Sequence, residues 1–148
     1  MNLAASIGKL SVECPTYICN AKKVTEVMGY WPSFHDAEVI SFSAARAAPG
    51  QVGKSSARLC VNVCQYDEVG AGIAEYEMAC CKSVLIEFLF IDLQFLSLKD
   101  FNHQNVINSI IFRQLENHSI EVEFESIFGV GGAIRCIGAE VSDVTMLL

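Results

Sequence analysis

The sequence predicts a mainly β (α+β) fold, built as a single antiparallel curved sheet or a β-sandwich of about seven strands with one short N-terminal helix. Three observations predict this class. Apolar and polar residues alternate with a period of two over most of the chain after residue 36. The segments between these stretches are short, as in antiparallel connections, and none is long enough for a repeated helical crossover. Phenylalanine, which favours strands, occurs nine times.

The length of 148 residues suits a single domain with a sizeable core. Apolar residues make up 52% of the chain and charged residues 18%, which excludes an intrinsically disordered protein. We expect one domain over residues 1–148, in which residues 1–20 form an N-terminal extension and residues 21–148 form the β domain.

Residues 20–29 are predicted to form the helix. Three apolar residues share one face of it at helical spacing: Val24, Val27 and Met28. Asn20 is a favourable N-cap residue, and Gly29 suits the position after the last turn, where φ becomes positive. The following Trp31-Pro32 pair ends the helix and begins an extended segment.

Strands are predicted, in chain order, over residues 36–45, 57–66, 76–91, 105–115, 119–127 and 133–144. Residues 76–91 could form one long strand or two joined ones, with a short continuation at 95–98, and residues 133–144 could form one strand or a pair. Alternation places the following apolar residues on one face of their strands: Ile40, Phe42, Leu59, Val61, Val63, Val84, Ile86, Phe88, Phe90, Ile120, Val122 and Phe124. Residues 84–91 are apolar on both faces, which predicts a strand in the middle of the sheet.

Turns are predicted where residues that favour turns gather between the strands. These turns cover residues 47–56, 67–72 and 116–118, and the glycines at 129, 131 and 132 mark a further one. In the turn at residues 116–118, Asn117 is expected to adopt the left-handed conformation.

The charge is negative and unevenly placed. The net charge is −7, and residues 83–148 alone carry −6, with nine acidic and three basic residues. Nucleic acid is therefore a poor candidate partner, because phosphates need Lys and Arg to replace their counterions. Alternation in residues 119–127 sets Glu121, Glu123 and Glu125 on the face opposite the apolar residues. This row could steer a basic partner protein, or it could be a plain solvated face.

The cysteine content indicates the compartment. An odd number of cysteines, seven, and the lack of a secretory signal predict reduced thiols in a cytoplasmic protein. Most of these cysteines are expected to be small core residues. The longest apolar stretch, residues 84–98, contains Glu87 and Asp92 and is shorter than a transmembrane span, so no membrane partner is expected.

The densest cluster of aromatic and polar residues is Trp31-Pro32-Ser33-Phe34-His35-Asp36-Ala37-Glu38. Its aromatic residues are expected to pin the helix to the sheet. Its polar residues could tie a turn through backbone hydrogen bonds or bind a partner protein. A metal site or an acid/base pair is a weaker alternative, because one short segment cannot supply the three or four ligands that a metal needs. The candidates for partner binding here are Trp31, Phe34, His35, Asp36 and Glu38.

A second polar cluster, Phe101-Asn102-His103-Gln104-Asn105, precedes a predicted strand. It could be a well-bonded loop, or Asn102, His103 and Asn105 could contact a partner. His103 could meet His35 in space and form a site with it. We expect no metal ion and no cofactor, and the sequence holds neither a nucleophile elbow nor a phosphate-binding loop.

Two segments carry a resemblance to a known family. Residues 29–39, GYWPSFHDAEV, resemble the N-terminal signature of the immunity protein 50 family of bacterial polymorphic toxin systems. Residues 101–106, FNHQNV, are similar to a second signature of that family, and the resemblance spans roughly residues 24–138. It implies a small cytoplasmic protein, not an enzyme, that binds a cognate protein toxin, for example a nuclease, and so neutralises it.

Two alternatives stay open beside this interpretation. The chain could be a generic binding module for a peptide or a small ligand. Less in keeping with the sequence, it could be a small metal-assisted hydrolase built on His35, Asp36, Glu38 and His103. A homo-oligomer also remains open.

Overall fold

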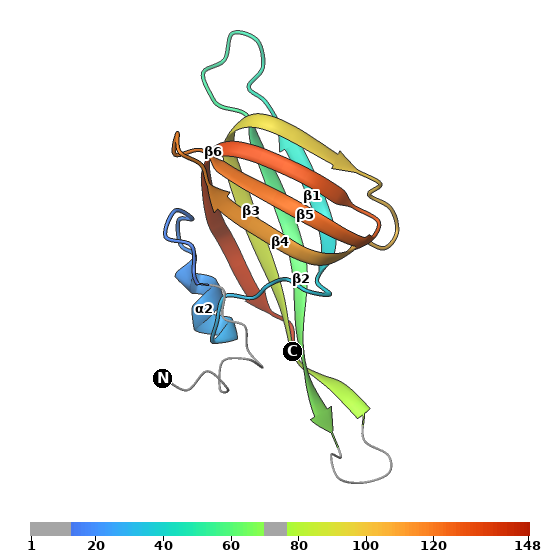
Figure 1. Cartoon of the computed structure of the whole chain (residues 1–148). Coiled ribbons are helices and arrows are strands. Elements are labelled where there is room, and N and C mark those ends of the chain that lie inside the picture. The colour runs from blue at the N-terminus through green and yellow to red at the C-terminus, as the bar shows by residue number, and fades with distance from the viewer. Residues whose placement is uncertain (1–12, 70–76) are drawn as a thin grey trace.

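The computed structural model describes residues 13–69 and 77–148. Within these residues, six antiparallel strands form one closed barrel, and a single helix, α2 (Lys22–Met28), lies beside it (Figure 1). The strands are β1 (Glu38–Ala45), β2 (Ser56–Val69), β3 (Glu77–Lys99), β4 (Val106–Gln114), β5 (Ile120–Phe128) and β6 (Gly131–Met146). They follow one another around the barrel in the order β1-β2-β3-β6-β5-β4, and β4 returns to β1.

The mainly β, antiparallel class is confirmed, with six strands rather than about seven. The stretch predicted over 76–91, together with its short continuation at 95–98, is one strand, β3, of 23 residues. Its register against β6 shifts between Glu87 and Phe88 and again between Leu93 and Phe95. Such bulges bend and twist a strand without ending it, and this lets the sheet curve until it closes. The turn predicted at 67–72 is wrong for residues 67–69, which still belong to β2, and its remaining residues lie outside the described residues, as does Tyr76.

The apolar faces predicted for β2, β3 and β5 fill the barrel. Every residue expected on these three faces is buried: Leu59, Val61, Val63, Val84, Ile86, Phe88, Phe90, Ile120, Val122 and Phe124. Strand β3 pairs with β2 on one side and β6 on the other, as expected for a middle strand. Its other face is not covered, however, since Leu85 and Leu89 are half-buried and Ile91 is exposed.

Strand β1 differs from the prediction. Ile40 and Phe42 were expected on one face, but Ile40 is 46% exposed while Val39 is buried. The register between β1 and β2 shifts between Val39 and Ser41, so Ile40 is the extra residue of a β-bulge. Alternation alone does not reveal a bulge, and every side chain after it changes face.

The helix is confirmed, but its N-cap is not Asn20. The N-cap is Ala21, without a side-chain hydrogen bond, and Asn20 lies before it in the left-handed region with φ 60°. Asn tolerates this conformation, which turns the chain sharply into the helix. At the other end, Gly29 has φ 87° and donates its N–H to the Thr25 carbonyl at 2.8 Å, as predicted. Lys82 Nζ donates to the Val27 carbonyl at 2.9 Å and ties the helix end to β3.

The segment before the helix joins β6. The N–H of Cys19 donates to the Ala139 carbonyl at 2.9 Å, and the N–H of Val141 donates to the Cys19 carbonyl at 2.8 Å. The neighbouring Ile18 is buried in the core. Residues 13–20, expected to belong to an extension, therefore pack against the barrel wall.

Two turns use other residues than expected. Between β4 and β5, His118 adopts the left-handed conformation with φ 66° rather than Asn117. The Asn117 side chain instead accepts hydrogen bonds from the N–H and hydroxyl of Ser119. Between β5 and β6, Gly129 makes the turn with φ 84°, whereas Gly131 and Gly132 already belong to β6.

The cysteines are less buried than expected. Cys136 is the one buried cysteine, and burial raises the pKa of its thiol to about 11. Cys19 and Cys81 are exposed, and the remaining four are half-buried. No disulfide joins any of the seven, all of which lie within the described residues. In the described part of the chain, no helix is long and apolar enough to cross a membrane.

Aromatic rings pack together where the chain passes from α2 to β1. Trp31 is 2% exposed, and Phe34 is 1% exposed. The Trp31 ring lies edge-on against Phe34, Phe88 and Phe112, with ring centroids 5.8, 6.3 and 5.7 Å away. The expectation that these aromatic residues pin the helix segment to the sheet is confirmed by this packing.

Replacing Trp31 with alanine should lower the free energy of unfolding by about 3–5 kcal/mol, because the change removes a large side chain from a closed core. Trp31→Phe keeps a ring in the cluster and should lose clearly less. Chemical denaturation followed by circular dichroism measures both. Equal stability of Trp31→Ala and the wild type would contradict the packing described here.

Candidate functional site

The two sequence motifs meet at the seam where the barrel closes. Strands β1 and β4 share one ladder pair, Glu38 with Val106. Beside it, the N–H of Val39 donates to the Asn105 carbonyl at 2.8 Å. The segment after Trp31 and the segment after Phe101 are thereby held side by side, although about 70 residues separate them in the chain.

The seam continues through the residues that precede β1. The N–H of Asp36 donates to the Ile107 carbonyl, and the N–H of Ile107 donates to the Ala37 carbonyl, both at 2.9 Å. A longer bond of 3.4 Å runs from the N–H of Ile110 to the Ser33 carbonyl. Strand β1 itself pairs with β4 at a single position. Most of the backbone hydrogen bonds to β4 therefore come from the residues just before β1.

A tight turn directs some side chains of this segment into the core and others toward solvent. Phe34 and Asp36 both have positive φ, 66° and 62°, and the N–H of Ala37 donates to the Phe34 carbonyl at 3.0 Å. Positive φ costs about 1–2 kcal/mol for a side chain such as that of Phe34. The burial of its ring among other aromatic rings offsets this cost. As a result, Phe34 points into the core, while His35 and Asp36 are exposed.

Asn105 braces the second motif from inside. Its side chain is buried, and its Oδ1 accepts hydrogen bonds from the N–H of Asn102 at 2.9 Å and from the N–H of Val130 at 3.1 Å. Its Nδ2 donates to the Asn102 carbonyl at 2.7 Å. Asn105 therefore ties the loop before β4 to the turn between β5 and β6. Gly129 belongs to the same brace, because a Cβ there would overlap the Gln104 carbonyl oxygen.

On the outer side of the seam, a polar network joins the first motif to β5. Asn108 Nδ2 donates to Glu125 Oε1 at 2.9 Å, so its Oδ1 faces His35 and accepts a hydrogen bond from His35 Nδ1 at 3.0 Å. The other ring nitrogen of His35, Nε2, lies 3.5 Å from Asp36 Oδ2. The His35 and Asp36 side chains are 60% and 62% exposed, so this network faces solvent.

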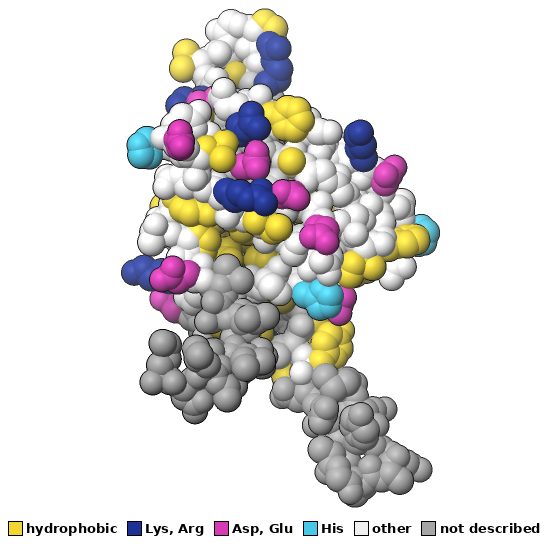
Figure 2. Space-filling view, viewed as in Figure 1, with side chains coloured by type: hydrophobic (Ala, Val, Ile, Leu, Met, Phe, Trp, Pro, Cys, Tyr) yellow, Lys and Arg dark blue, Asp and Glu magenta, His cyan; other side chains and the backbone are white. Residues whose placement is uncertain are grey.

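The acidic row is not a bare acidic surface. Arg113 Nη1 lies 3.1 Å from Glu121 Oε1 and 2.9 Å from Glu123 Oε2, and Arg135 Nη2 lies 3.3 Å from Glu121 Oε2. The hydrogen bond to Glu123 is the main cause that raises the pKa of Arg113. Figure 2 shows acidic and basic side chains beside one another on this face. Only Glu125 of the row lacks an arginine partner among the described residues.

The predicted site residues thus fall into two groups. Trp31, Phe34 and Asn105 are buried, so they shape the site from inside and do not present a side chain to a partner. The remaining residues are exposed or half-buried: His35, Asp36, Glu38, Asn102, His103, Glu121, Glu123 and Glu125.

His35 and His103 do not share a contact. The His103 ring lies edge-on to Phe128, with ring centroids 6.1 Å apart, and His35 contacts Asn108 and Asp36. In residues 13–69 and 77–148, no three His, Cys, Asp or Glu side chains converge in a way that could hold a metal ion.

Sequence reasoning missed Asn108, Arg113 and Arg135. The pairing of Arg113 with Glu121 could have been predicted, because the predicted turn at 116–118 already sets these residues opposite each other. The pairing of Arg135 with Glu121 could not, since it depends on where the turn at Gly129 ends. Asn108 lies where the register between β4 and β5 shifts, and alternation gives no signal for such a position.

Comparison with protein-family models places most of the chain within one family. Residues 20–147 match the model described as Immunity protein 50. The match covers both motifs and the whole barrel. A search of curated proteins found no match, and neither did a search of solved structures.

Substituting Asn105 with alanine should lower the free energy of unfolding by about 2–3 kcal/mol, because the buried N–H of Val130 and the partly buried N–H of Asn102 lose their acceptor. Asn108→Ala removes an exposed amide from the same strand region and should change stability by about 0.5 kcal/mol or less. Urea denaturation of the two variants checks this contrast. The brace would be refuted by similar losses in both.

Replacing Gly129 with alanine should destabilise the protein more than replacing Gly50 with alanine. Both have positive φ, 84° and 82°, but a Cβ at Gly50 meets nothing within 4 Å. Gly50→Ala should cost only the left-handed penalty of about 1–2 kcal/mol. Gly129→Ala adds a clash with backbone and should cost about 3 kcal/mol or more. Thermal unfolding midpoints of both variants test the difference.

Proposed function

The chain belongs to the immunity protein 50 family, and from this premise we propose that it binds a cognate polymorphic toxin in the cytoplasm and neutralises it. The family is one of immunity proteins, so its role is a non-catalytic one. Neutralisation would be stoichiometric: the bound chain covers the toxin's active surface and performs no chemistry itself. The family match over residues 20–147 carries this proposal.

We place the toxin-binding surface on the outer side of the seam. The exposed side chains of the first motif continue there into the outer face of β4, β5 and the part of β6 that pairs with β5, residues 132–136, through the contact chain of His35, Asn108 and Glu125. His103 and Asn102 lie on the loop that the seam holds beside the first motif. The side chains under this surface are buried and packed against one another, so we expect the surface to need little ordering when a partner binds.

The charges on this surface favour a basic toxin, such as a nuclease. On β4, β5 and the part of β6 that pairs with β5, three of the five charged residues are acidic and two are arginines, and the chain as a whole carries −7. Charge complementarity of this kind acts on the rate of encounter more than on the lifetime of a complex. Arg113 and Arg135 would fix the carboxylates in place before the toxin arrives.

A hydrolase is not favoured by the geometry. The His35–Asp36 pair is largely exposed, and no third ligand of the described residues joins it. A binding module for a peptide has more support, because the described part of the chain contains a pocket of about 440 Å³ at the barrel wall.

Co-expression with the cognate toxin tests the proposal. Cells that produce this chain should survive toxin expression, because the toxin is held in a complex, and survival is measured as colony counts. The control is the same vector with a stop codon early in the coding sequence. Equal killing with and without the chain would contradict the immunity function.

Reversing two charges tests the surface. Glu123→Lys with Glu125→Lys should slow toxin association by about tenfold or more, with little change in dissociation. Glu121 is left in place, because it holds both arginines. Glu26→Lys with Asp143→Lys changes the net charge equally at other exposed positions and serves as the control.

Stopped-flow or surface-plasmon measurements at two salt concentrations provide the readout. The difference between the two double variants should shrink at about 1 M salt, where the screening length falls to about 3 Å. If both variants associate equally fast, the toxin binds elsewhere, and the immunity function is unaffected by that result.

A further inference from the structure

Strand β4 loses its neighbour halfway along. On one side it pairs with β5 over its whole length. On the other side, the seam with the first motif ends at the bond between Ile110 and Ser33. From there to Gln114, no strand among the described residues pairs with this side of β4. As formed by residues 13–69 and 77–148, the barrel wall therefore has a gap at the C-terminal end of β4.

The register with β5 identifies the backbone groups that face the gap. The N–H of Leu115 donates to the Ser119 carbonyl at 2.8 Å, and Arg113 pairs with Glu121. Bonding alternates along an antiparallel ladder, so the odd-numbered residues of this stretch bond to β5. Phe112 and Gln114 consequently direct their N–H and carbonyl groups toward the gap.

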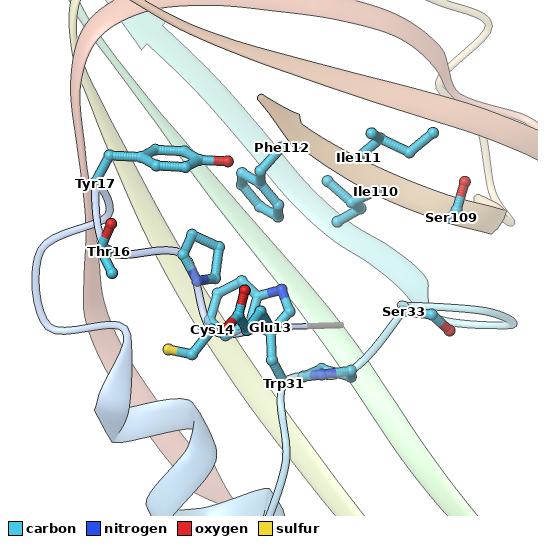
Figure 3. Close-up of a pocket in the computed structure, with 12 residues that line it drawn as sticks. Glu13, Cys14, Thr16, Tyr17, Trp31, Ser33, Ser109, Ile110, Ile111 and Phe112 are labelled. Atoms are coloured by element: carbon cyan, nitrogen blue, oxygen red, sulfur yellow. The ribbon is translucent and has the colours of Figure 1, made fainter. Parts of the chain in front are cut away.

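A pocket of about 440 Å³ lies along this free edge. Its opposite wall is the segment from Glu13 to Tyr17, and Trp31 and Pro32 line its base. Figure 3 shows Tyr17 and Phe112 facing each other across one end of it. The volume lies within the range of about 300–1,000 Å³ that is usual for ligand sites.

We propose that an extended peptide segment of a partner protein inserts here as an additional strand along β4. Its backbone would hydrogen-bond to Phe112 and Gln114, and one apolar side chain would fill the pocket above Trp31. The identity of the partner rests on the proposed function: if the chain is an immunity protein, the partner is the toxin. The inserted segment is then the part of the toxin that this chain holds.

An extended peptide fits the gap better than other occupants. Unpaired N–H and carbonyl groups on a strand edge are matched by another extended backbone, and strand addition to such edges is a recurring mode of peptide recognition. Residues 13–17 face the edge across the pocket, which fits one inserted chain better than the folded edge of a second copy. The carboxylate of Glu13 at the pocket favours a segment that is neutral or basic.

Amide hydrogen exchange on the full-length chain, followed by NMR, is the first test. In the free protein, the amides of Phe112 and Gln114 should exchange much faster than those of Ile111 and Arg113, which bond to β5. If all four exchange equally slowly, the chain covers its own edge, and the proposal is overturned.

Linear peptides provide the second test. We would select binders from a phage-displayed library of random peptides and synthesise them. Trp31 is the one tryptophan of the chain, so binding should change the tryptophan emission. Bound peptide should also slow exchange at Phe112 and Gln114 by tenfold or more. A library that yields no peptide with both effects overturns the proposal.

The variant Gln114→Pro removes one outward N–H and leaves the ladder to β5 intact, as proline can at a strand edge. It should weaken peptide binding by about tenfold, whereas Gln114→Ala, which keeps the N–H, should bind as the wild type does. Should Gln114→Pro unfold, the exchange data on the wild type still decide the question.

The complex with the toxin separates the two proposals. Protection of the Phe112 and Gln114 amides in that complex supports strand insertion by the toxin. If the toxin is neutralised but these amides stay fast, immunity stands and insertion by the toxin is wrong. If the chain does not protect cells and the library peptides still bind as described, the peptide site stands and the immunity function is wrong.

Discussion

The closure of the barrel depends on a small number of backbone hydrogen bonds between residues 33–39 and residues 105–110. Strands β1 and β4 contribute one ladder pair to this seam, and the irregular segment before β1 contributes most of the rest. Without the seam, β1 and β4 would both be open edges of a curved sheet, and the aromatic residues beneath would be exposed. The position of the exposed face also follows from it, because the seam sets His35 beside Asn108.

The seam explains why inward and outward residues alternate so closely in the first motif. Trp31 and Phe34 pack in the core, and Ser33, His35 and Asp36 lie outside it. The left-handed conformations of Phe34 and Asp36 make this alternation possible within a few residues. The surface that we propose for recognition lies directly over the buried aromatic cluster, so substitutions in this motif act on stability as well as on the proposed binding.

The sequence was informative where one local rule decides the outcome. Alternation identified the buried faces of β2, β3 and β5, and the tolerance of glycine for positive φ identified the end of α2 at Gly29. It failed where a choice depends on partners distant in the chain. The bulge at Ile40 and the closure of β1 onto β4 both arise from pairing between strands. The apolar–polar alternation of a single strand does not reveal which strand it pairs with, or in which register. The contact of Arg135 with the acidic row was missed for the same reason, since Arg135 comes from a strand whose register the sequence does not reveal.

The order of the strands around the barrel has a consequence for synthesis. Strand β3 pairs with β6 along most of its length, although β4 and β5 lie between them in the chain. The wall therefore closes only after β6 has been synthesised and has left the ribosome, and a topology rich in such distant pairings folds slowly. If the chain acts against a toxin as we propose, slow folding would require a standing supply, made before the toxin appears.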